Sequence, residues 1–199
     1  MPNSFQGAGA VGIGLKLQLR NNSSRYGALA LAAHWMTVLL VLASWLLGTY
    51  GDLLPRGTPS EVGLIVHMCM GLTVLMISLS RLAWRLIDQQ PNPERTHLGV
   101  WGERASTIVH YALYALLFAV PILGILTQFM RGHPLPIFGL FEIASPLSAD
   151  RSLARSLKDV HGWLADGILI LAALHAGAAI LHHWVLRDNT LRRMLPISR

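Results

Sequence analysis

The chain has 199 residues, of which 53% are hydrophobic and only 13% are charged, and its formal net charge is +6. This composition, with a mean hydropathy of +0.47, excludes an ordinary water-soluble domain and indicates a membrane protein. The sequence contains no nucleic-acid-binding motif, so we expect membrane lipid, and no nucleic acid, to be the partner of the positive charge.

Four stretches of the chain lack charged residues and are long enough to cross a membrane. They run over residues 26–51, 62–80, 105–130 and 167–186. A helix needs about 20 apolar residues to cross roughly 30 Å of hydrocarbon. The last stretch reaches back to Val160 if Asp166 is tolerated within the span. We therefore predict an all-α membrane protein, a bundle of four transmembrane helices.

The segments between these spans predict one domain over residues 24–196, preceded by a flexible cytoplasmic tail over residues 1–23. The connections "GDLLPRGTPSE" and "QQPNPERTH" have the Pro, Gly and charge content of turns. The connection over residues 131–159 is longer than a turn requires, and we expect a short interfacial helix near Ser148 to Leu157 within it.

Basic residues gather on one side of the predicted spans. Eleven Lys and Arg lie in the N-terminal segment, the connection between the second and third spans, and the C-terminal tail, against five in the other two connections. The positive-inside rule therefore places both termini in the cytoplasm.

Four histidines inside the spans divide into two pairs by depth. His161 and His175 are fourteen residues apart, which leaves them roughly 40° apart on one helix face and about 21 Å apart along the axis. His67 lies near the outer end of the second span, and His34 lies near the inner end of the first. Depth therefore pairs His67 with His161 and His34 with His175. Each pair can hold a haem iron from both axial sides.

Small residues near these histidines leave space for a planar cofactor, although small residues also let membrane helices approach closely. They are Gly71, Gly162, Ala172, Ala173, Ala176 and Gly177. Other metal centres fit less well, because a di-iron bundle needs inward carboxylates and a zinc site needs four converging ligands. The single Cys69 cannot form a CxxCH attachment site, so any haem is bound without a covalent link.

Two further histidines have more than one interpretation. His182 lies within about 20° of the His175 face and roughly 10.5 Å nearer the cytoplasm. It can compete with His175 as the partner of His34, donate as a neutral imidazole to a quinone carbonyl and relay a proton, or lie at the interface beside His183. His110, on the third span, has no partner left at its level, and it can contact a haem propionate or a quinone, or serve in packing.

The four spans resemble the bacterial cytochrome b561 family over residues 24–196. The motifs that carry the resemblance are "RYGALALAAHW", "LIVHMCMG", "HYALYALLFAVPILG" and "VHGWLADGILILAALHAGAAILHHWVLRDNTLRRMLP". The resemblance implies a four-helix protein of the bacterial inner membrane, with two haem b groups between the helices and ubiquinone as a redox partner. It assigns the four axial ligands to His34, His67, His161 and His175.

The resemblance also implies an oxidoreductase of electron transport, fed by a small-molecule or protein donor at the outer face. Some family members are superoxide oxidases that pass electrons from superoxide to quinone. If superoxide is the donor, Lys158, Arg155 and Arg151 are the cations that would steer it, although they can also be part of a merely solvated loop. Two alternatives remain, a haem-bearing anchor subunit that links a soluble dehydrogenase or hydrogenase to quinone, and a haem-free ion transporter that uses the histidines.

Overall fold

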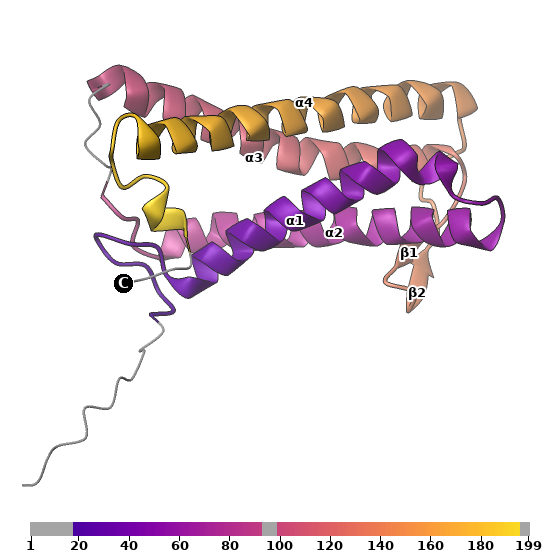
Figure 1. Ribbon diagram of the computed structural model, residues 1–199. Helices are drawn as coiled ribbons and strands as arrows, with labels where there is room; N and C mark the ends of the chain where they lie inside the picture. The colour runs from indigo at the N-terminus through magenta and orange to yellow at the C-terminus, as the bar shows by residue number, and fades with distance from the viewer. Residues whose placement is uncertain (1–17, 93–98, 196–199) are drawn as a thin grey trace, which may run out of the picture.

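The computed structural model describes residues 18–92 and 99–195. Four long helices dominate it: α1 (Ala28–Tyr50), α2 (Thr58–Ile87), α3 (Gly99–Met130) and α4 (Arg151–Trp184). They run side by side in two layers, with α3 and α4 in one layer and α1 and α2 in the other (Figure 1). Each is long and apolar enough to cross a membrane, so the predicted four-helix membrane bundle is confirmed.

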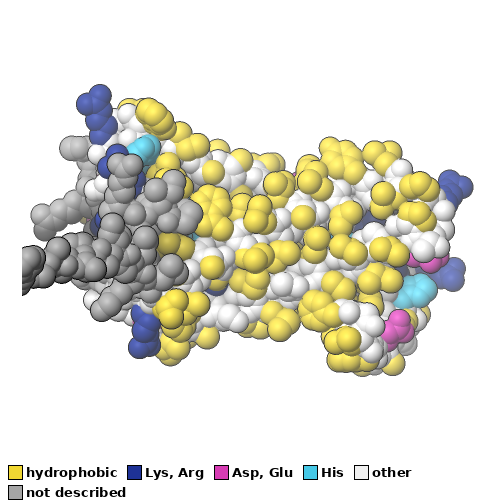
Figure 2. All heavy atoms as spheres, turned by 60° about the horizontal axis from the view of Figure 1, so that its bottom comes forward, with side chains coloured by type: hydrophobic (Ala, Val, Ile, Leu, Met, Phe, Trp, Pro, Cys, Tyr) yellow, Lys and Arg dark blue, Asp and Glu magenta, His cyan; other side chains and the backbone are white. Residues whose placement is uncertain are grey.

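The outer surface of the bundle is apolar. Leu39, Ile108 and Leu174 are 62%, 67% and 65% exposed. Figure 2 shows hydrophobic side chains along the middle of one face, with Lys and Arg side chains at the two ends of the molecule. An apolar band of this extent is unfavourable in water, whereas membrane hydrocarbon would cover it without cost.

The helices extend beyond the uncharged stretches of the sequence. Arg81 and Arg85, expected in a connection, lie in the last turns of α2. The predicted interfacial helix at residues 148–157 is wrong as a separate element, because α4 begins at Arg151 and continues through it. Asp150 caps this start by accepting hydrogen bonds from the backbone N–H groups of Ser152 and Leu153, at 2.9 and 3.0 Å.

A small β-hairpin occupies part of the connection between α3 and α4. Strands β1 (Leu135–Ile137) and β2 (Phe141–Ile143) pair antiparallel, with Leu135 opposite Ile143. Phe138 and Gly139 both have positive φ, 52° and 71°, the backbone conformation of a type I′ turn. The buried Leu135 anchors the hairpin against α2 and α3. We call this end of the bundle, which also contains the short helix η1 (Gly51–Leu53), the hairpin end.

The described chain begins and ends at the opposite end, which we call the terminal end (Figure 1). Residues 18–23, the described part of the predicted tail, lie against the end of α2, where the backbone N–H of Asn21 donates to Asp88 at 2.9 Å. The short helix η2 (Arg192–Met194) is held by Trp35, whose indole N–H donates to the Met194 carbonyl at 2.8 Å. Residues 1–17 lie outside the described part of the chain.

An apolar cluster fills the middle of the bundle. Val74, Leu117 and Ile168 are buried there and come from α2, α3 and α4. Helix α1 approaches α4 at few places, but Trp45 joins them by donating its indole N–H to Asp166 at 2.8 Å. This hydrogen bond accounts for the tolerance of Asp166 within a span, because an intramembrane carboxylate needs a polar partner.

Candidate functional site

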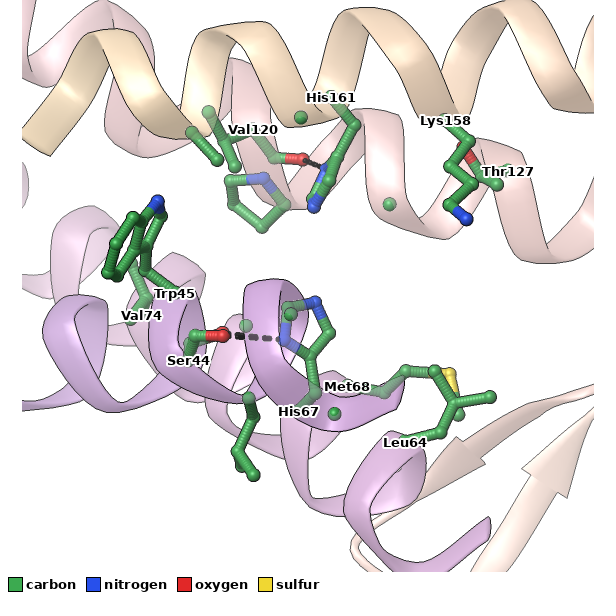
Figure 3. Close-up of a pocket in the computed structure, with 18 of the residues that line it drawn as sticks. Ser44, Trp45, Leu64, His67, Met68, Val74, Val120, Thr127, Lys158 and His161 are labelled. Atoms are coloured by element: carbon green, nitrogen blue, oxygen red, sulfur yellow. Dashed lines mark hydrogen bonds between the residues drawn. The ribbon is translucent and has the colours of Figure 1, made fainter. Parts of the chain in front are cut away.

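Two of the predicted ligands, His67 on α2 and His161 on α4, face each other near the hairpin end. Their ring centres are 6.0 Å apart. Figure 3 shows the two rings on opposite sides of a cavity, each approaching from its own helix layer. The cavity has a volume of about 610 Å³, within the range of roughly 300–1,000 Å³ that is usual for cofactor sites.

Each ring is held by a backbone carbonyl of the neighbouring helix in its own layer. His67 Nδ1 lies 2.8 Å from the Ser44 carbonyl of α1, and His161 Nδ1 lies 2.8 Å from the Val120 carbonyl of α3. A carbonyl oxygen only accepts, so both Nδ1 atoms must carry the hydrogen. In a neutral ring this leaves the Nε2 lone pair free, the arrangement found in metal-binding histidines.

The distance between the rings fits one iron held from both sides. A histidine nitrogen binds a metal at about 2.0 Å, and the ring centre lies about 1 Å behind that nitrogen, so two axial imidazoles have centres roughly 6 Å apart. The 6.0 Å separation of His67 and His161 matches this value. The site therefore fits a bis-histidine haem without any large movement of its ligands.

Two glycines that the sequence analysis did not single out make room for these rings. A Cβ at Gly48 would lie 3.0 Å from His67 Cε1, and a Cβ at Gly124 would lie 3.3 Å from His161 Cε1. Both glycines stand inside helices, where glycine costs about 1 kcal/mol relative to alanine. A glycine inside a predicted helix was therefore the signal in the sequence that could have pointed to these positions, because such a glycine commonly reflects close packing.

Three imidazoles gather at the level nearer the terminal end. The rings of His110 and His175 have centres 5.0 Å apart, and His34 lines the same cavity as His110. His110 therefore lies beside two histidines that the sequence analysis had already paired with each other. Its Nδ1 donates to the Ser106 carbonyl of its own helix at 2.6 Å.

A second cavity, of about 660 Å³, opens at this level and contains His34 and His110 in its lining, but not His175. The guanidinium of Arg81 enters it and lies 3.4 Å from His34 Nδ1. Because guanidinium only donates, His34 Nδ1 must accept here, which is the opposite role from that of Nδ1 in His67 and His161.

The cations predicted to steer an anion have separate positions. Lys158 lines the cavity between His67 and His161 together with Arg131, which the sequence analysis did not include among these cations, whereas Arg151 and Arg155 are not part of its lining. All three predicted cations lie on α4, with Arg151 and Arg155 in its first turns. About one turn of helix separates Arg155 from Lys158. Lys158 therefore lies at the cavity, whereas Arg155 and Arg151 lie outside its lining.

His182 has an acidic partner that the sequence analysis did not identify. Its Nδ1 lies 2.5 Å from Asp188 Oδ2. Arg187 adopts a positive φ of 54°, a strained conformation for this residue type that turns the chain back towards α4. Burial alone would raise the pKa of Asp188, but the hydrogen bonds from His182 and Thr190 outweigh it and hold the pKa below its ordinary value. The pair is therefore present at neutral pH and is lost as the pH falls through that lowered pKa.

Comparison with known proteins identifies the family to which the chain belongs. The prokaryotic cytochrome b561 family matches residues 25–196. The chain belongs to this family. It is 30% identical over 185 residues to "Cytochrome b561 homolog 2" of Escherichia coli K12, a match that covers 90% of this chain and 95% of that protein. It is 33% identical over 181 residues to "Probable superoxide oxidase CybB" of Yersinia pestis, covering 88% and 98%.

"Cytochrome b561 homolog 1" of Escherichia coli K12 is 28% identical over 177 residues, covering 87% of this chain and 98% of that protein. These matches extend over all four spans, so the resemblance drawn from the motifs is confirmed. As a cytochrome b561, the protein is a multi-pass membrane protein of electron transport with haem b as the cofactor implied by its family.

Replacing Gly124 by valine should displace His161, because even the first side-chain carbon would lie 3.3 Å from the ring. We expect haem affinity to fall by about 10- to 100-fold, as it does for metals when the support of a ligating histidine is disturbed. Haem titration of the purified apo-protein measures this. Gly167→Ala is the matched control, because nothing lies within 4 Å of its added carbon and Gly167 does not line the cavity. Equal haem affinity in both variants would contradict the assignment.

Proposed function

We propose that this cytochrome b561 holds two haem b groups in series and passes electrons from a donor at the hairpin end to ubiquinone at the terminal end. The observation that carries the proposal is the pair of opposed imidazoles, 6.0 Å apart, each with its Nδ1 hydrogen bonded to a carbonyl. Haem supplies the one-electron carrier, and the protein supplies ligands, spacing and charge.

For the inner haem we propose His34 and His175 as the ligands. They come from α1 and α4, which belong to different layers and approach each other at few places, so a macrocycle could be held between them. His110 and His175, in contrast, are carried by two helices that pack together along their length (Figure 1). We therefore assign His110 to the surroundings of the inner haem.

The proposed membrane is the bacterial inner membrane, with the hairpin end outside and the terminal end in the cytoplasm. The bias of Lys and Arg supports this orientation. It places the His67 and His161 pair near the outer face. It also places His182, at the end of α4, near the cytoplasmic face.

Superoxide is the donor that we propose, and a relative named as a probable superoxide oxidase supports this choice. Two superoxide anions would each lose one electron and leave as molecular oxygen, while one ubiquinone would gain both electrons and two protons to become ubiquinol. Lys158 and Arg131, at the outer cavity, would attract the anion.

Protons for the quinone would pass through His182. With Asp188 accepting from Nδ1, the neutral ring has only an acceptor at Nε2, so the ring must be protonated before it can donate. This modifies the role predicted from sequence, in which a neutral imidazole donates.

Single histidine substitutions test the ligand pairs. His67→Ala and His161→Ala should remove the same spectral component, and His34→Ala and His175→Ala should remove the other. Each site is expected to lose its haem when one of its two axial ligands is removed. Absorbance spectra before and after dithionite, with haem counted after acid-acetone extraction, measure this. Wild-type protein should release two haems per chain. His110→Ala is the control and should keep both components; loss of the His175 component in His110→Ala but not in His34→Ala would reassign the ligand.

Salt and charge variants test the superoxide donor. Haem reduction by superoxide should slow between 0.1 M and 1 M salt, because the Debye length falls from about 10 Å to about 3 Å. Lys158→Gln combined with Arg131→Gln should slow it by roughly 10-fold at low salt, since steering raises encounter rates by at least about that factor. The matched control is Arg151→Gln with Arg155→Gln, which removes the same charge away from the cavity. If the rate of haem reduction by superoxide changes neither with salt nor in the variant that lacks Lys158 and Arg131, electrostatic steering of superoxide is excluded.

His182→Ala tests the quinone end. Reoxidation of the reduced protein by added ubiquinone should slow on the order of 100-fold, the usual contribution of a general acid, while reduction by the donor stays unchanged. Asp188→Asn should slow the same step, because the carboxylate that holds the His182 ring through Nδ1 is lost. Stopped-flow absorbance of the haem follows both steps, with His183→Ala as the neighbouring control. Unchanged reoxidation in His182→Ala would place the quinone elsewhere.

A further inference from the structure

Arg81 is a cation in the last two turns of α2 without an anionic partner among the described residues. It lies six residues before the last residue of α2, about 9 Å along the helix axis. Asp88 pairs with Arg20, and Asp188 pairs with His182, so neither of these carboxylates serves Arg81. Charged groups inside a membrane are costly unless they are paired, so the guanidinium requires a compensating group that the described chain does not supply.

The guanidinium of Arg81 turns into the bundle. Nη1 donates to Thr37 Oγ1 at 3.2 Å, Nη2 lies 3.4 Å from His34 Nδ1, and Cζ lies 5.6 Å from the centre of the Tyr114 ring. Thr37 is buried, with 4% of its surface exposed. An arginine that only extended its charge to the membrane interface would point away from such a residue. Its contacts are all to neutral groups, and the one to His34 is long.

A second unsatisfied donor belongs to the same cavity. Trp84 Nε1 is buried and has no hydrogen-bond partner. Trp84 follows Arg81 by three residues on α2, so the two side chains share a helix face, and both line the cavity that contains His34. Indole nitrogen only donates. This N–H has almost no accessible surface, so only an acceptor that displaced the atoms covering it could reach it.

The lining of this cavity indicates that the partner of Arg81 is an anion. It includes Arg85 as well as Arg81, and no Asp or Glu among the described residues contributes to it. We infer that Arg81 binds a carboxylate, a propionate of the inner haem. The inference rests on the proposed function, because it needs a haem at His34.

This assignment also explains the unusual hydrogen bond of His34. With Arg81 beside it, His34 Nδ1 accepts, and the hydrogen of the neutral ring sits on Nε2. A propionate that takes the guanidinium would release Nδ1, so that the hydrogen moves to Nδ1 and the Nε2 lone pair becomes available to iron. Arg81 would then be a positioning residue that couples propionate binding to ligation by His34.

Haem with and without free carboxylates tests this directly. In a His67→Ala background, which leaves only the inner site, the full-length apo-protein is titrated in detergent with haem b and with haem b dimethyl ester. We expect haem b to bind at least about 10-fold more tightly than the ester, because charge-assisted hydrogen bonds exceed neutral ones by this much or more. Arg81→Ala should abolish the preference by weakening haem b and not the ester.

Three further variants control for the loss of charge and for the source of the carboxylate. Arg104→Ala removes an exposed cation that stacks on Trp101 and does not line the cavity, and it should keep the full preference. Arg81→Lys keeps the charge without the planar fork and should retain part of it, which covers the case that Arg81→Ala does not fold. Glu94, outside the described residues, is replaced by glutamine to test whether the chain itself supplies the carboxylate.

The outcomes distinguish the sources of the anion. Equal binding of haem b and its ester by the background protein overturns the inference, as does an unchanged preference in Arg81→Ala. If Arg81→Ala weakens both forms equally, the anion is a lipid phosphate or Glu94, and the propionate assignment is wrong. If the background protein binds neither form, the two-haem proposal fails, and the inference fails with it.

Discussion

The hydrogen bond from an imidazole Nδ1 to a backbone carbonyl is the interaction on which the outer site depends. A histidine inside a membrane needs a partner for its N–H group, and the carbonyls of Ser44 and Val120 provide one for His67 and for His161. These bonds fix the tautomer and the orientation of each ring. They also tie the site to the fold, because each carbonyl belongs to the helix packed beside the one that carries the ligand.

The two-layer arrangement follows from the same requirement. Each layer brings one imidazole and the carbonyl that holds it, and the proposed haem would lie between the layers. Gly48 and Gly124 belong to this design, since a Cβ at either position would press on a ring at 3.0 or 3.3 Å. Between the two histidine levels the helices close directly on each other through Val74, Leu117 and Ile168. This apolar cluster occupies the space that separates the two sites.

Polar groups inside the spans are few, and their partners indicate what each one does. Asp166 is held by Trp45 across the approach of α1 to α4, so its role in the described structure is to join two helices. Arg81 contacts neutral groups alone and shares its cavity with the unsatisfied Trp84. Asp166 therefore has a hydrogen-bond donor as its partner, whereas Arg81 has neutral partners and no anion among the described residues, which is why we propose a ligand for it.

Length and hydropathy in the sequence were sufficient to predict the four spans, because the membrane imposes a local constraint of about 20 apolar residues per helix. Helical geometry likewise related His161 to His175, since both lie on one helix. Neither hydropathy nor the geometry of a single helix could predict which side chains of different helices come into contact. The place of His110 beside His175 depends on how α3 packs against α4, and the pairing of Asp188 with His182 depends on a turn with positive φ at Arg187. The sequence by itself determined which residues lie in the membrane and at what depth, whereas the tertiary structure decided which of them meet, because packing between helices sets distances that no single helix contains.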